Sequence, residues 1–83
     1  MPWSVVILDA RVMEELAAQP LDIRAKFSRI CELIEVHGLE RVHEPYIKHL
    51  QGPLWEMRMS GRDGIARAIY VTARAQRVVV LRV

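Results

Sequence analysis

The chain has 83 residues, of which 52% are hydrophobic and 27% are charged, with a formal net charge of +2. This length allows one small domain with a thin core, over residues 1–83, and the composition excludes an intrinsically disordered chain. No uncharged apolar run is long enough for a membrane span, and no basic leader marks a secretory signal. The single cysteine, Cys31, excludes an internal disulfide and predicts a buried thiol, which is typical of a reducing, cytoplasmic location.

Charge is distributed unevenly along the chain. Residues 1–44 contain five Lys or Arg against eight Asp or Glu, whereas residues 45–83 contain seven against two. Arginine binds phosphate oxygens well because its planar guanidinium group offers several N–H donors and stays charged when partly buried. The pattern favours a polyanionic partner, and the alternative is a merely solubilising surface. The basic residues of the second half are Lys48, Arg58, Arg62, Arg67, Arg74, Arg77 and Arg82.

The first half predicts a strand and two helices. Residues 3–8 (WSVVIL) are apolar and largely β-branched, as in a short strand. Asp9 is a candidate N-cap for a helix that ends at Pro20, and Asp22 is a candidate N-cap for a longer helix that ends at Gly38. The longer helix presents one apolar stripe, formed by Ile23, Phe27, Ile30 and Ile34.

The second half predicts three strands, over residues 54–59, 65–72 and 77–83, with turns at 60–64 and 73–76. Short connections favour an antiparallel meander, and the two helices must cover its apolar face. The N-terminal strand is expected to join as an edge, so the predicted fold class is α+β. The first of these strands alternates, with Trp55, Met57 and Met59 on one face and Glu56 and Arg58 on the other.

Two arginines of this meander are candidates for phosphate chemistry. If the turn closes between residues 60 and 64, Arg58 and Arg67 come from neighbouring strands and can bracket one phosphate, with Arg62 in the turn between them. Equally, these side chains could form an exposed face paired with Glu56. Tyr70 falls on the opposite face from Arg67 and is predicted to lie in the core.

No metal, cofactor or nucleophile site is predicted. His37, His43 and His49 recur every six residues, a spacing that suits neither a helical nor a strand pair of metal ligands. The serines lack a Gly-x-Ser-x-Gly elbow, and no glycine-rich phosphate loop is present.

The runs Leu50-Gln51-Gly52-Pro53-Leu54-Trp55-Glu56-Met57-Arg58 and Gly64-Ile65-Ala66-Arg67-Ala68-Ile69-Tyr70 resemble the phage-derived branch of the RelE/HigB toxins. That branch belongs to the RelE/ParE superfamily of type II toxin–antitoxin systems. Its pattern reads L-x-G-x-L-W-E-L-R, a short basic turn, and then a glycine and R-x-x-Y. The motif covers residues 50–70, and the order of strand, helical hairpin and meander is similar over the whole chain.

The resemblance implies a cytoplasmic, metal-independent endoribonuclease that cleaves mRNA, usually on the ribosome. A ribose 2′-hydroxyl would attack the neighbouring phosphate, with Arg58 and Arg67 on that phosphate and Glu56 as a candidate proton acceptor. The implied partner is a cognate antitoxin, expected to be of the helix-turn-helix type. The remaining basic residues implied to bind RNA are Lys48, Arg62, Arg74, Arg77 and Arg82.

Members of that branch continue past the last strand into a phenylalanine and a lysine pair, whereas this chain stops at Val83. We therefore expect a form shortened at the C-terminus, which places the activity of the 83 residues in question. Two alternatives stay open at this point. One is a ParE-type inhibitor of DNA gyrase, and the other is a catalytically inactive module that binds RNA or a partner.

Overall fold

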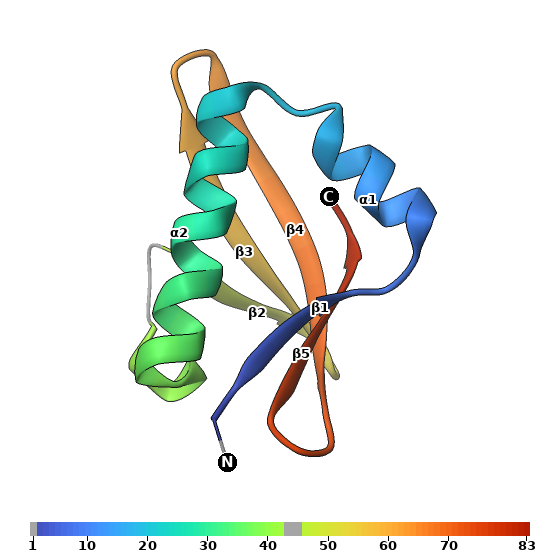
Figure 1. Ribbon diagram of the computed structural model, residues 1–83, viewed down its shortest axis with the longest axis vertical. Helices are drawn as coiled ribbons and strands as arrows, with labels where there is room; N and C mark the ends of the chain where they lie inside the picture. The colour runs from blue at the N-terminus through green and yellow to red at the C-terminus, as the bar shows by residue number, and fades with distance from the viewer. Residues whose placement is uncertain (1, 43–45) are drawn as a thin grey trace.

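The computed structural model describes residues 2–42 and 46–83. Its first half contains β1 (Ser4–Ile7), α1 (Ala10–Ala17), α2 (Leu21–His37) and the short 3-10 helix η1 (Leu39–Arg41) (Figure 1). Its second half contains β2 (Ile47–Gln51), β3 (Leu54–Gly61), β4 (Gly64–Ala73) and β5 (Arg77–Arg82). The order of strand, two helices and antiparallel strands confirms the predicted α+β class.

Two of the predicted helix boundaries have the expected local chemistry. The Asp9 carboxylate accepts a hydrogen bond from the backbone N–H of Val12 at 3.1 Å and so caps α1. At the other boundary, Gly38 follows α2 with a φ of +90°. This left-handed value is one that glycine adopts without a Cβ clash, and it lets the chain leave the helix and enter η1.

Asp22 was predicted to cap α2, and that prediction is wrong, because the helix begins at Leu21, two residues earlier than such a cap requires, and Pro20 occupies the cap position. One carboxylate oxygen of Asp22 accepts from the backbone N–H of Ile23 at 2.9 Å, and the other from that of Arg62 at 2.6 Å. Gly61 passes so close to α2 that an added Cβ would lie 2.6 Å from Ile23 Cδ1. The start of α2 therefore anchors the turn between β3 and β4.

The sheet has five strands in the order β1-β5-β4-β3-β2. β1 lies parallel to β5 at one edge, as expected for the N-terminal strand, and the other neighbours are antiparallel. The sequence predicted a meander of three strands, but the structure adds β2 as a fourth. Four of the five β2 residues are exposed, so this strand lacks the apolar alternation by which strands are recognised.

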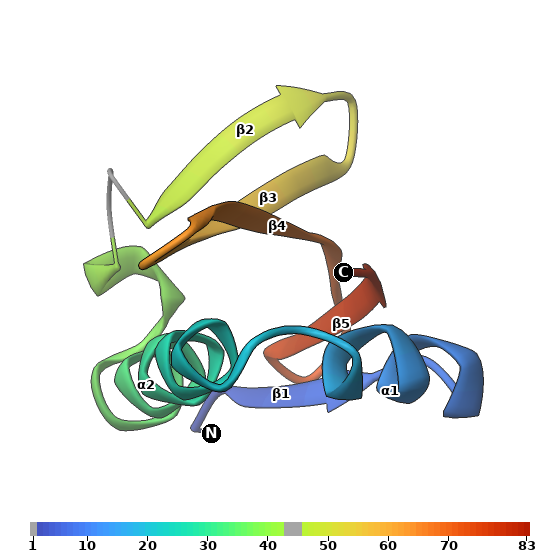
Figure 2. The same cartoon turned by 90° about the horizontal axis from the view of Figure 1, so that it is seen from above.

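The core lies between the helices and one face of the sheet, which curls around α2 (Figure 2). α2 packs against β3 and β1, and α1 packs against β5. The predicted stripe of α2 and the predicted apolar face of β3 both contribute to it. The buried core residues are Val12, Ile23, Phe27, Ile30, Ile34, Val42, Ile47, Met57, Met59, Ala68, Tyr70, Val78 and Val80.

Candidate functional site

Arg58 of β3 and Arg67 of β4 are direct cross-strand partners. Their strand neighbours Met57, Met59 and Ala68 are fully buried against the helices. Because side chains alternate along a strand, both arginines project from the opposite face, which we call the outer face of the sheet. Their side chains are 35% and 51% exposed, so both guanidinium groups reach solvent.

Glu56 bridges the two arginines. Its Oε1 lies 3.2 Å from Arg58 Nε, and its Oε2 lies 3.5 Å from Arg67 Nε. The whole residue is only 5% exposed, although it projects from the outer face. Arg58 Nε is itself buried and makes no hydrogen bond, so its contact with Glu56 is an ion pair without hydrogen-bond alignment. One shielded carboxylate thus holds two cations side by side.

Lys48 adds a third cation to this group. It is the cross-strand partner of Glu56 from β2 and is exposed. Three basic side chains therefore surround one acidic side chain, and the local charge is positive. Such a patch attracts a phosphate and can place donors on more than one of its oxygens.

The other basic residues predicted to bind RNA lie elsewhere. Arg62 lies in the turn between β3 and β4, whereas Arg74 and Arg77 lie around the turn at the opposite end of β4 (Figure 1). Arg82, at the end of β5, forms an ion pair with Glu15 of α1 at 3.6 Å. Of the five residues, the structure thus brings Lys48 alone beside the arginine pair.

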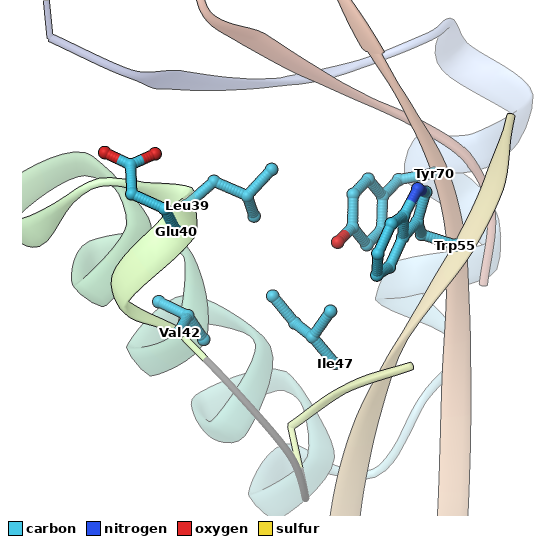
Figure 3. Close-up of a pocket in the computed structure, with 6 residues that line it drawn as sticks. All are labelled: Leu39, Glu40, Val42, Ile47, Trp55 and Tyr70. Atoms are coloured by element: carbon cyan, nitrogen blue, oxygen red, sulfur yellow. The ribbon is translucent and has the colours of Figure 1, made fainter. Parts of the chain in front are cut away.

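Tyr70 faces away from the arginines, as predicted. It lines a cavity of about 280 Å³ between η1 and the sheet, and its hydroxyl points into that cavity (Figure 3). Burial raises the pKa of Tyr70 from 10.0 to about 12, so the hydroxyl stays neutral even in moderately alkaline solution. The cavity is otherwise lined by Leu39, Glu40, Val42, Ile47 and Trp55.

Metal ligands do not converge in the described residues. Within residues 2–42 and 46–83, no three His, Cys, Asp or Glu side chains are grouped so that they could hold a metal ion. Of the three evenly spaced histidines, His43 lies outside the described residues. In the same part of the chain, neither main helix is long and apolar enough to cross a membrane.

Cys31 lies half-buried on α2. Burial, followed by the nearby charge of Glu35, raises the pKa of its thiol from 9.0 to about 12. A thiol with a raised pKa is a poor nucleophile, which agrees with the structural role expected for it.

The fold and site together define a small α+β protein that presents paired arginines on the open face of a sheet. The family model of the phage-derived protein Gp49-like (DUF891) matches residues 14–83. The chain therefore belongs to the Gp49-like phage-derived family, a toxin-like family of the RelE/HigB type. No match was found among curated proteins.

Proposed function

We propose that this protein is the toxin of a toxin–antitoxin module and that it cleaves mRNA on the ribosome without a metal ion. The observation that carries the proposal is the direct pairing of Arg58 with Arg67 on the outer face. Membership of a toxin-like family supports the assignment as a toxin. Two partly exposed guanidinium groups on adjacent strands can bind both non-bridging oxygens of one phosphodiester.

Metal-independent cleavage of RNA can proceed through the ribose itself. The 2′-oxygen forms a bond to phosphorus, and the bond from phosphorus to the 5′-oxygen breaks. This leaves a 2′,3′-cyclic phosphate and a free 5′-hydroxyl. One proton leaves the 2′-hydroxyl, and one is delivered to the 5′-oxygen, which water can supply. Arg58 and Arg67 would stabilise the extra negative charge of the pentacoordinate phosphorus.

Glu56 is the candidate proton acceptor, since it is the carboxylate that lies between the two arginines. Only 5% of its surface is exposed, and the neighbouring cations are the groups that would hold the substrate phosphate within its reach. Arginine is unsuited to accept the proton because its pKa lies far above neutrality.

The test is a cell-free translation assay in which cleavage sites on the mRNA are mapped. Arg67→Gln should remove cleavage, and Arg11→Gln is the matched control because Arg11 lies on α1, which packs against β5 and away from the arginine pair. A supercoiling assay with DNA gyrase runs in parallel. Inhibition of gyrase without mRNA cleavage would assign the protein to the ParE type, and RNA binding without cleavage would make it an inactive module.

We propose a cognate antitoxin as the protein partner, as family membership suggests, and we propose further that it is of the helix-turn-helix type. An antitoxin that covers the outer face should be acidic there, because that face carries Lys48, Arg58 and Arg67 around one carboxylate. Sequencing the adjacent open reading frame tests this partner. A neighbouring gene for a protein without a helix-turn-helix would contradict the antitoxin type proposed.

A further inference from the structure

Tyr46 directly precedes β2 and lies close to the arginine pair in the backbone of the sheet. Its carbonyl oxygen accepts a hydrogen bond from the backbone N–H of Arg58 at 2.8 Å, which places the two residues opposite each other. The next residue, Ile47, is buried and pairs with Met57 in the core. By alternation, Tyr46 therefore faces the same side as Arg58. Tyr46, which directly precedes β2, thus forms one row with Arg58 of β3 and Arg67 of β4.

The surroundings of Tyr46 differ from those of the other large aromatic residues. Tyr70 is buried in the core, and Trp55 packs on His49 with ring centroids 4.7 Å apart. Tyr46 is 41% exposed, and among the described residues no aromatic ring or cation is stacked on it. An aromatic ring is thus left open to solvent next to three cations.

We propose that Tyr46 is a stacking platform for a base of single-stranded RNA whose adjacent phosphate is held by Arg58 and Arg67. Aromatic side chains bind unpaired bases through their faces, while basic side chains follow the backbone. The row of three residues crosses two strand spacings, or roughly 10 Å. The row therefore places a site for a base next to a site for a phosphate, in the same sequence as the base and the phosphate of one nucleotide. This inference rests on the proposed function, because it requires RNA at the arginine pair.

Stacking on Tyr46 would also help to orient the RNA for cleavage. Two cations alone can hold a phosphate in several rotational positions, and a stacked base removes that freedom. Every base has an aromatic face, so this contact selects unpaired nucleotides rather than a particular sequence.

The test uses a short 2′-O-methyl RNA oligonucleotide, which lacks the free hydroxyl needed for self-cleavage. A second oligonucleotide has the same backbone with the central base removed. Binding of both is measured for the wild type, Tyr46→Ala, Tyr46→Phe and Arg67→Gln. Val36→Ala is the control for loss of an exposed apolar side chain, because Val36 lies on α2, away from the outer face. Circular dichroism of each variant verifies that it is folded.

Tyr46→Ala should weaken binding of the intact oligonucleotide by about tenfold and leave binding of the abasic one unchanged. Tyr46→Phe should bind like the wild type, since it keeps the ring. If Arg67→Gln weakens binding of both oligonucleotides, either of two results overturns the stacking role and leaves the proposed function standing. In the first, Tyr46→Ala binds the intact oligonucleotide as tightly as the wild type does. In the second, Tyr46→Ala loses the same affinity for the intact and the abasic oligonucleotide. If the wild type binds neither oligonucleotide, the proposed function fails as well.

Discussion

Arg58 and Arg67 are cross-strand partners whose Nε atoms lie 3.2 and 3.5 Å from the two oxygens of one carboxylate, that of Glu56. Two independent features therefore fix the separation of the two guanidinium groups: the backbone pairing of β3 with β4, and the Glu56 carboxylate that both groups contact. Such a preformed pair binds an anion at a lower entropic cost than two independent side chains.

Replacing Glu56 with Gln should separate binding from catalysis. Loss of the negative charge removes its repulsion of a phosphate, which should outweigh the loss of the shared acceptor, so affinity for 2′-O-methyl RNA should rise by about fivefold, which corresponds to ~1 kcal/mol. Loss of the proton acceptor should lower mRNA cleavage by about a hundredfold or more. Binding is measured by fluorescence anisotropy and cleavage by primer extension. Unchanged cleavage in Glu56→Gln would exclude Glu56 as the acceptor.

Gly61→Ala should destabilise the fold, because the added methyl group would meet Ile23 Cδ1 at 2.6 Å. The expected loss is about 1–3 kcal/mol in the free energy of unfolding, measured in urea. Ile23→Val removes the nearest of the clashing atoms, so the double variant should lose less than the sum of the two single variants. Strict additivity would show that the start of α2 does not restrict this turn.

Cys31 should react slowly with iodoacetamide in the folded protein. Its pKa of about 12 leaves little thiolate at pH 9.0, the ordinary pKa of this group. Alkylation at that pH should be about a hundredfold slower than in the urea-unfolded protein. Equal rates would contradict the raised pKa.

The same thiol should make the protein less stable in alkali. At pH values below 9.0, the thiol is protonated in both states and its contribution to stability is fully present. Between pH 9.0 and about 12, the unfolded chain ionises first, and this contribution is lost. Urea unfolding at several pH values, compared with Cys31→Ala, checks the direction. A smaller dependence on pH in Cys31→Ala is the expected result, and an identical one would contradict it.

Ala75→Gly should stabilise the protein. Ala75 lies in the turn between β4 and β5 with a φ of +63°, a left-handed value that a Cβ disfavours. Relief of this strain should raise the free energy of unfolding by about 1 kcal/mol. Ala73→Gly is the matched control at the end of β4, and it should lower stability by about 0.5–1 kcal/mol. A loss of stability in Ala75→Gly would show that the turn is not strained.

Local patterns predicted most of the elements correctly. Apolar residues at helical spacing identified the buried stripe of α2, and strict alternation over residues 54–59 placed Met57 and Glu56 on opposite faces of β3. Both patterns depend only on the geometry of one element, which the sequence expresses directly. β2 was missed because its position at the sheet edge leaves four of its five side chains exposed and removes the periodic signal.

The candidate site was only partly predictable for the same reason. Arg58, Arg67 and Glu56 were identified by their place in the expected hairpin and by the family resemblance. Tyr46 was missed, since it precedes a strand that the sequence did not reveal. The available signal was the Gln51-Gly52-Pro53 segment before β3, which is typical of a hairpin turn and implies a preceding strand.

The amino-acid sequence by itself determined the order of the elements, the side of β3 on which each residue lies, and the arginine-rich chemistry of the second half. Only the tertiary structure decided which residues of different strands stand opposite one another, and so brought Lys48, Tyr46 and Glu56 together beside the arginine pair. The physical reason is that strand register depends on turns and on contacts between distant segments, such as that of Asp22 with the Arg62 backbone. These long-range interactions produce no repeating pattern of residue types in the sequence, so they cannot be read from it.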